Sequence, residues 1–265
     1  MKPCCLECQK GLHEALLILR HSVVKMVSKV FNWLTTIFYF YLTYRGISLI
    51  FLECDEHKYK SIIYQYGLEN KHKYLSIWVS FLQTLYFVIV SFSDIVNCLP
   101  SVFVCPRWSQ YSTNARHYLL TSLVLPLTLY IFTVFWTFYL YDREVIYPEL
   151  FDRFIPPWLN HAMHSLPVPI LLVHLILGPN HNPSRTSALV GLSLLFVVYG
   201  VVFGASVLKG NWVYLLFNNL NPSQRMFLLT ISYPLTIVFL TISRGLNSFV
   251  KGTKEKYAVK EKGSQ

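Results

Sequence analysis

The sequence predicts an all-α fold, a polytopic membrane helix bundle of about six transmembrane helices preceded by an amphipathic helix. Hydrophobic residues make up 54% of the 265 residues and charged residues only 14%, whereas a soluble domain carries about 25% charged residues. The mean hydropathy is +0.42. Apolar stretches of roughly twenty residues, the length that crosses a bilayer, recur along the chain. They lie at residues 31–52, 74–97, 118–140, 158–177, 187–208 and 226–243.

The N-terminal segment, residues 1–30, reads as a cytoplasmic tail with a surface helix. Apolar residues recur at helical spacing over residues 12–30, and charged residues such as Arg20 and Lys25 lie off that stripe. This pattern is typical of an amphipathic helix lying on a membrane surface. Three cysteines upstream are either palmitoylated or ordinary thiols, and the sequence leaves this open: Cys4, Cys5 and Cys8.

Residues 31–245 then form the six-span membrane domain. The fourth span contains Pro167 and Pro169, which should kink the helix or leave carbonyl groups without donors. The segment after it, residues 246–265, is rich in lysine and glutamate and is predicted to be a solvated basic cytoplasmic tail.

The charge distribution predicts the orientation of this integral, multi-pass protein. Six spans place both termini on one side, and most of the 23 Lys and Arg residues fall on that side. Because cationic loops favour the cytoplasm, both termini are expected there. The net charge of +10 is spread among apolar segments, which argues against a nucleic-acid partner. The sequence does not choose between endoplasmic reticulum and plasma membrane, nor does it give the oligomeric state.

Ionisable groups inside the predicted spans are costly in a bilayer, so each requires an explanation. Any one of them alone could be a snorkelling or internally bonded structural residue: Arg45, Asp94, His161, His164 and His174. On the predicted topology, however, Ser76, His164 and Arg45 lie at similar depth in one leaflet. A hydroxyl, an imidazole and a guanidinium placed together are what a nucleophile–base pair with an anion anchor needs.

Asn160 precedes His164 by one helical turn, so the two share a helix face. The Asn160 amide oxygen could accept from one ring N–H of His164, which would leave the other ring nitrogen free as a base. His161 also lies nearby, and spacing does not decide which histidine acts. A metal site of His161 and His164 with Asp152 or Glu149 is a weaker alternative. Because the spacing of these residues is only weak evidence for a metal site, we expect neither a metal nor a cofactor.

One long segment of the sequence resembles a known protein family. The run WTFYLYDREVIYPELFDRFIPPWLNHAMHS, residues 136–165, resembles the androgen-induced gene 1 and androgen-dependent tissue-factor-pathway-inhibitor-regulating protein family. Shorter pieces that also resemble the family are Lys73-Tyr74-Leu75-Ser76 followed by Gln83, Pro183-Ser184-Arg185 and Trp212-Val213-Tyr214. The resemblance extends over residues 35–245.

The resemblance implies a membrane hydrolase that cleaves fatty acid esters of hydroxy fatty acids (FAHFAs) with a threonine nucleophile and a histidine. Carried over by position, the histidine is His164 and the threonine position is occupied by Ser76. A serine keeps the hydroxyl but lacks the β-branch that stiffens threonine. If the alignment slips, Ser80 or Ser61 become rival nucleophiles.

The remaining roles follow as expectations from this interpretation. Asn160 would orient His164, and Arg45 and His161 would bind the lipid ester substrate, with Arg45 on its free carboxylate. The oxyanion donors stay open among Trp136, Tyr141 and Trp158. The competing interpretation is a non-catalytic membrane regulator or lipid-binding scaffold of the same family. A transporter is disfavoured, because no pair of matched broken helices appears in two halves of the chain.

Overall fold

The computed structural model describes residues 3–51, 70–99, 106–153 and 155–263, and all of their regular secondary structure is helical. The side chains of residues 3–18 lie outside this description, as do residues 52–69, and with them Cys4, Cys5, Cys8 and Ser61. The long helices are α1 (Pro3–Phe51), α3 (Leu75–Val96), α4 (Pro106–Leu119), α5 (Leu125–Tyr141), α6 (Pro157–His164), α7 (Pro167–Leu177), α8 (Arg185–Leu208) and α9 (Pro222–Gly263).

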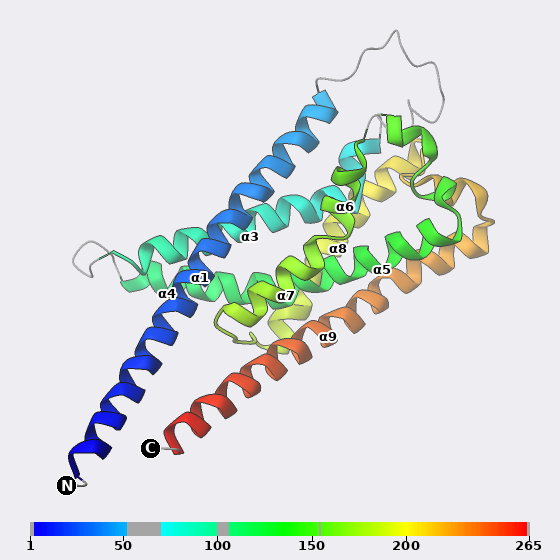
Figure 1. The fold of residues 1–265 in the computed structure, drawn as a ribbon. Coiled ribbons are helices and arrows are strands. Elements are labelled where there is room, and N and C mark those ends of the chain that lie inside the picture. Colours follow the sequence, from blue (N-terminus) through cyan, green and yellow to red (C-terminus); the bar gives the residue numbers. More distant parts are fainter. Residues whose placement is uncertain (1–2, 52–69, 100–105, 154, 264–265) are drawn as a thin grey trace.

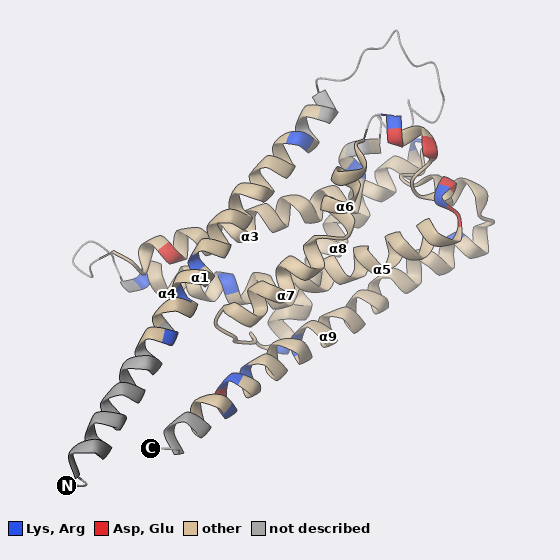
Figure 2. Cartoon of the chain, viewed as in Figure 1, with Lys and Arg blue, Asp and Glu red and all other residues tan. Residues whose placement is uncertain are grey.

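Short helical turns connect them. A π-helical turn, η2 (Leu120–Val124), joins α4 to α5 into one continuous helix. The 3-10 turns are η1 (Lys71–Lys73), η3 (Arg143–Val145), η4 (Glu149–Arg153) and η5 (Leu215–Asn219). The helices form an elongated bundle in which α1 packs along α3 and α5 packs along α9 (Figure 1). Charged residues of the described segments gather toward the two ends of the bundle (Figure 2).

Four or five of the six expected spans have counterparts among the described helices. In the described part of the chain, four helices are long and apolar enough to cross a membrane: Leu75–Val96, Arg107–Tyr141, Arg185–Leu208 and Pro222–Val259. The pair α6 and α7 gives a fifth if it is one span bent by 44°. That bend falls where Pro167 and Pro169 predicted a kink, because neither proline can donate to the helical ladder. The expected first span, residues 31–52, lies in α1 and is not among these helices, but its last residues are only partly described, so a sixth span stays a prediction.

Both ends of the chain also differ from expectation. Residues 12–30 are not a separate surface helix, because α1 continues through them into the predicted first span without a break. The basic C-terminal segment is helical, since α9 continues to Gly263. The connection between the second and third expected spans contains the polar helix α4.

The core forms from apolar side chains that face one another across the bundle. One cluster joins α1, α3, η2, α6 and α7 around Tyr39, Phe87 and Leu171, and a second joins α3, α5, α8 and α9 around Leu127 and Leu192. Small polar residues hold α1 to α3, since Thr36 Oγ1 lies 2.8 Å from Ser91 Oγ. Helices pack closely at such residues when lipid supplies no hydrophobic driving force between them. Many other leucines, valines and isoleucines remain exposed, which suits contact with lipid.

One end of the bundle contains a buried polar cluster of Asn32, Tyr86, Asp94, Arg116 and His174. Asn32 Nδ2 donates to Asp94 Oδ2 at 2.6 Å, and Arg116 Nη1 lies 3.7 Å from Asp94 Oδ1. His174 Nδ1 donates to Asn32 Oδ1 at 2.9 Å, so its Nε2 accepts the Tyr86 hydroxyl at 2.7 Å. These bonds join α1, α3, α4 and α7.

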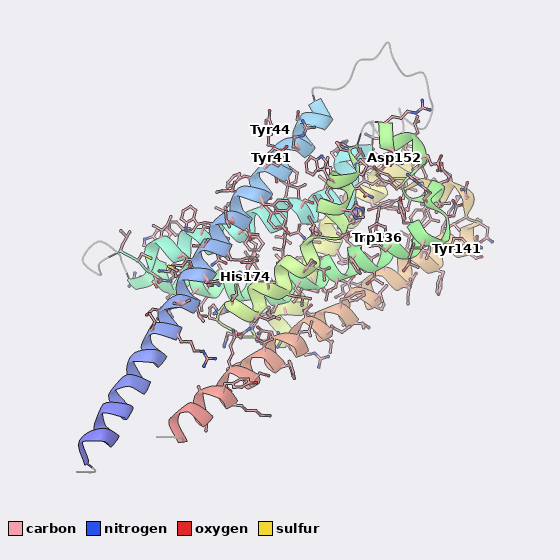
Figure 3. The ribbon with its side chains drawn as sticks, in the orientation of Figure 1. Tyr41, Tyr44, Trp136, Tyr141, Asp152 and His174 are labelled. Carbon is pink, nitrogen blue, oxygen red and sulfur yellow. The ribbon has the colours of Figure 1, made fainter. Side chains whose placement is uncertain are left out.

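The cluster explains two of the polar residues that the sequence placed inside spans. Asp94 and His174 bond to neighbouring helices rather than reaching into a site, and His174 lies inside the bundle, far from Asp152 at the opposite end (Figure 3). A buried charge tolerates low dielectric only when it is paired and hydrogen-bonded. We therefore interpret the polar cluster as a structural tie between helices.

This interpretation predicts that Arg116→Ala destabilises the protein. The substitution leaves the Asp94 carboxylate buried without its cation, a change that costs about 3–5 kcal/mol in proteins. Thermal unfolding of the detergent-solubilised protein should show a clearly lowered midpoint. Arg107→Ala, on the exposed face of the same helix, is the matched control and should melt like the wild type. Equal midpoints for Arg116→Ala and the wild type would contradict the structural role of the cluster.

Candidate functional site

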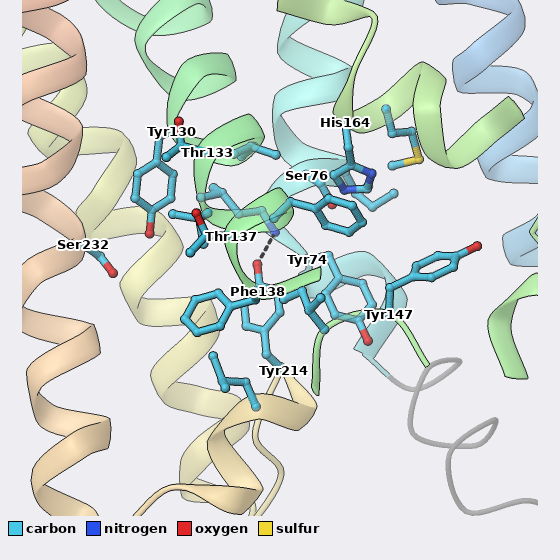
Figure 4. Close-up of a pocket in the computed structure, with 18 of the residues that line it drawn as sticks. Tyr74, Ser76, Tyr130, Thr133, Thr137, Phe138, Tyr147, His164, Tyr214 and Ser232 are labelled. Atoms are coloured by element: carbon cyan, nitrogen blue, oxygen red, sulfur yellow. Dashed lines mark hydrogen bonds between the residues drawn. The ribbon is translucent and has the colours of Figure 1, made fainter. Parts of the chain in front are cut away.

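A cavity of about 720 Å³ opens in the half of the bundle that lies away from the polar cluster. It is bounded by the first turn of α3, by α5, α6, α8 and α9, and by the turns that follow α5 and α8. Its wall is mainly apolar, and Figure 4 shows the few polar side chains that project from it. These include Tyr74, Ser76, Tyr130, Thr133, Thr137, Asn160, His164, Tyr214 and Ser232. None of the described residues that line it is a lysine, arginine, aspartate or glutamate.

Ser76 lines this cavity from the first turn of α3. The helix begins here because Tyr74 has an extended backbone, with φ −66° and ψ 130°, and an apolar run follows it. The Ser76 side chain is half-buried, and its hydroxyl makes no hydrogen bond with any residue that the structure describes. The hydroxyl is therefore available to a molecule in the cavity.

His164 lines the same cavity and is the last residue of α6. Its ring stacks on Phe135 of α5, with centroids 3.7 Å apart and planes 14° apart. Its Nδ1 lies 3.1 Å from the backbone carbonyl oxygen of Asn160. Because a carbonyl only accepts, Nδ1 carries the proton and Nε2 keeps a free lone pair. The imidazole is thus held in the tautomer that a general base requires.

The structure corrects the expected role of the Asn160 side chain. The acceptor that orients His164 is the main-chain carbonyl of Asn160, whereas we expected its amide oxygen. The side chain is only 6% exposed, and its Oδ1 makes no hydrogen bond with any described residue. Any residue at this position of the helix would offer the same carbonyl, so the amide remains available for another purpose.

Ser76 and His164 are distant in sequence but line one cavity (Figure 4). Within the described residues, no hydrogen bond joins them. Catalytic hydrogen bonds are often long without substrate and tighten only in the reacting complex, so this geometry is compatible with a nucleophile and its base.

Arg45 and His161, expected to bind substrate, lie outside the described cavity wall. Arg45 is half-buried on α1, and its neighbour Gly46 lines the cavity instead. His161 is exposed on α6, its Nδ1 lies 3.0 Å from Ser165 Oγ, and its ring stacks on Trp136. The substrate-binding roles of both residues stay predictions.

The expected oxyanion donors are also placed elsewhere. Trp136, Tyr141 and Trp158 do not line the cavity in the described structure, and Tyr141 is 85% exposed. Trp158 stacks on Tyr41 of α1. Trp136 stacks on His161. Because none of the three lines the described cavity, we look for the donor to a developing negative charge among other groups.

The residues of the alternative metal site are engaged separately. Within the described residues, no group of three or more His, Cys, Asp or Glu side chains gathers where it could hold a metal ion. Asp152 instead accepts a hydrogen bond from Arg143 Nη2 at 2.8 Å, and that bond raises the pKa of Arg143. This ion pair joins η3 to η4 in the segment that follows α5, beside the cavity.

Two tyrosines fix the start of α3, and their role was not predicted. The Tyr214 hydroxyl accepts the N–H of Leu75 at 2.9 Å and lies 3.1 Å from the hydroxyl of Tyr199 (Figure 4). Burial raises the pKa of Tyr214 to about 12, so it stays protonated at neutral pH. No spacing in the sequence links these residues to α3, because they meet it only through the fold.

Comparisons with known proteins give the family. The model of the FAR-17a/AIG1-like protein family matches residues 30–248. The Androgen-dependent TFPI-regulating protein of Mesocricetus auratus is 32% identical over 88% of this chain and 94% of its own length. The Androgen-induced gene 1 protein of Homo sapiens is 33% identical over 54% of this chain and 60% of its own length. No solved structure matches. The chain therefore belongs to the FAR-17a/AIG1-like protein family.

Proposed function

We propose that this protein is an intramembrane lipid hydrolase that cleaves FAHFAs, with Ser76 as nucleophile and His164 as general base. The observation that supports it is the convergence of Ser76 from α3 and His164 from α6 on one apolar cavity. A hydroxyl without a hydrogen-bond partner and an imidazole with a defined tautomer are the parts that nucleophilic ester cleavage needs.

The reaction follows from these two groups. The Ser76 Oγ attacks the ester carbonyl carbon while His164 Nε2 takes the hydroxyl proton, and the carbonyl oxygen becomes an oxyanion. When the carbonyl re-forms, the bond to the alkoxy oxygen breaks and His164 returns the proton to that oxygen, which releases the hydroxy fatty acid. Water then attacks the acyl-enzyme, again losing its proton to His164, and frees the fatty acid and Ser76. Proton transfer of this kind contributes about 10²–10⁴-fold.

The cavity suits the acyl part of such a substrate. Its volume of about 720 Å³ lies within the range of about 300–1,000 Å³ of small-molecule sites, and its lining is chiefly apolar. No charged side chain of the described wall would have to lose its hydration when a hydrocarbon chain enters. The free carboxylate of the substrate therefore stays toward the cavity opening, where Arg45 beside Gly46 remains a candidate to meet it.

The second candidate is a non-catalytic membrane regulator or lipid-binding scaffold. The missing hydrogen bond between Ser76 and His164 favours it, as does a serine where the family resemblance implies a threonine. The same cavity would then hold a lipid without cleaving it. Turnover of an ester by the purified protein separates the two functions.

We place the protein in the endoplasmic reticulum or plasma membrane with both termini in the cytoplasm. The first residues of α1 and the last of α9 lie toward the same end of the bundle (Figure 1), and both segments carry several lysines. Such cationic segments are retained on the cytoplasmic side.

Ser76→Ala and His164→Ala test the proposal directly. Ser76→Ala should reduce FAHFA hydrolysis in membranes to that of membranes lacking the protein, because no hydroxyl remains to form the acyl-enzyme. His164→Ala should lower turnover by about 10²–10⁴-fold. Ser76→Thr keeps the nucleophilic hydroxyl and should remain active, and a fluorophosphonate probe should label the wild type at Ser76.

Ser80→Ala is the matched control, because Ser80 lies one turn further along α3 and its hydroxyl donates to the Ser76 carbonyl. It should retain turnover and probe labelling. Full activity of both Ser76→Ala and His164→Ala would refute the hydrolase, whereas activity lost only in Ser80→Ala would move the nucleophile there.

A second prediction distinguishes the two histidines. His161→Ala should retain most of the FAHFA turnover at equal expression, because the His161 ring stacks on Trp136 outside the described cavity wall. The measurement compares it with His164→Ala in the same membranes. A loss as deep as that of His164→Ala would return His161 to the catalytic site.

The third prediction concerns acyl-chain length. Gly200 of α8 lines the cavity, and a Cβ there would meet no atom within 4 Å, so Gly200→Phe should fill part of the cavity without strain in the helix. Turnover of long-chain esters should fall at least about tenfold relative to short ones, because removing room for a single methylene in a hydrophobic pocket costs about 1–3 kcal/mol of discrimination. Gly204→Phe has similar open space but lies outside the lining, and should keep the wild-type preference. The same chain-length profile in both variants would place the acyl chain elsewhere.

A further inference from the structure

The first turn of α3 leaves one backbone donor unused beside the nucleophile. Such turns have N–H groups without intrahelical acceptors. Here the N–H groups of Ile77 and Trp78 donate to the Tyr74 carbonyl, at 3.1 and 3.4 Å, and that of Leu75 donates to the Tyr214 hydroxyl. The N–H of Ser76 donates to no residue of the described chain. An unpaired donor therefore lies on the same residue as the hydroxyl that faces the cavity.

The tyrosines at this helix end have no hydrogen left to donate. Tyr199 donates to the Lys73 carbonyl at 3.1 Å. The hydrogen between the two hydroxyls, which lie 3.1 Å apart, must then come from Tyr214. Because each hydroxyl has a single hydrogen, Tyr214 lines the cavity without being able to donate into it.

A second unpaired group lies across the cavity on α6. Asn160 is 6% exposed and lines the cavity. Its Oδ1 is buried without a hydrogen-bond partner, and its Nδ2, the donor that an oxyanion would need, makes no hydrogen bond with any described residue. Leaving a buried amide unpaired costs about 1–3 kcal/mol. Its main-chain carbonyl already orients His164, so the side chain is not needed for that role. Only the Nδ2 end of this amide can donate to an oxyanion, since Oδ1 is an acceptor, and the Nδ2 hydrogens are not used by any described residue.

We propose that the backbone N–H of Ser76 and the side-chain amide of Asn160 together form the oxyanion site for the ester carbonyl. This inference rests on the proposed hydrolase function and deepens it. When Ser76 Oγ bonds to the carbonyl carbon, the electron pair of the C=O bond moves to the oxygen, and the two N–H donors stabilise that charge until the leaving group departs. In the serine-protease template, the nucleophile's own N–H is likewise one of two donors.

The helix itself supports this charge. The 22 residues of α3 align their peptide dipoles, and the positive end of that dipole lies at Ser76. Preorganised donors of this kind act strongly in an apolar, water-poor site, because they need no reorganisation as charge develops. Asn160 would thus be a catalytic residue through its side chain, while its carbonyl is a positioning group for His164.

The test compares Asn160→Ala and Asn160→Leu with the wild type by FAHFA hydrolysis in purified protein. Both variants keep the carbonyl that orients His164, and leucine also fills the volume of the amide. We expect kcat to fall about 10²–10³-fold, the loss typical for one oxyanion donor, with KM unchanged. A long-chain alkyl boronic acid, which forms a tetrahedral anion on a serine, should lose inhibition by a similar factor. Inhibition by the free fatty acid product should not change.

Three outcomes separate the possibilities. His164→Ala and Asn114→Ala, an exposed asparagine on α4, are assayed together with these variants, and Asn114→Ala should match the wild type. If the wild type hydrolyses the ester, His164→Ala does not, and both Asn160 variants keep the wild-type kcat, the oxyanion site is refuted but the hydrolase stands. A raised KM with unchanged kcat, together with a lowered thermal midpoint, assigns Asn160 to packing and also refutes it. Absence of hydrolysis by the wild type refutes both proposals.

Discussion

The break between α6 and α7 determines the geometry on which the candidate site depends. Pro167 and Pro169 have no N–H, so the hydrogen bonds of the helix that begins at Pro157 end with the N–H groups of Ser165 and Leu166, which donate to the His161 carbonyl. The two halves meet at 44°, and His164 lies at a helix end rather than within a straight span. At that position its ring can stack on Phe135 while its Nδ1 is bonded to the Asn160 carbonyl. In a straight helix, the His164 side chain would point in a different direction.

The polar groups that hold the helices together and those that line the candidate site lie at opposite ends of the bundle. At one end, Asp94, Arg116 and His174 satisfy one another across four helices. At the other, the groups that line the cavity are left incompletely bonded: the hydroxyl and N–H of Ser76 and the amide of Asn160. Buried polar groups are normally paired, so unpaired groups that line a cavity are open to a partner on a bound molecule. The polar end supports the helices, and the cavity end remains open to a lipid.

The family assignment and the cavity give different kinds of support. The FAR-17a/AIG1-like match over residues 30–248 covers every helix that bounds the cavity, at least in part, but the names of the relatives describe regulation by or dependence on androgen rather than a reaction. The hydrolase proposal therefore depends on Ser76, His164 and their surroundings in this chain. The described residues of the wall include no charged side chain, which favours a hydrocarbon occupant over a polar metabolite.

The sequence by itself determined the helical class, the bend at the prolines and the two residues, Ser76 and His164, that now line one cavity, because hydropathy, proline chemistry and motif resemblance are local properties. Four or five of the six spans that it predicts have counterparts among the described helices, and the span at residues 31–52 stays a prediction. Only the tertiary structure separated His164 from His161, moved the orienting acceptor from the Asn160 side chain to its carbonyl, and brought Tyr214 to the start of α3. The contacts of His164, of the Asn160 carbonyl and of Tyr214 either join residues far apart in the chain or depend on which atom of a residue faces its neighbour. Periodicity does not encode either property, because it gives the face of a helix but neither its partner nor the rotamer.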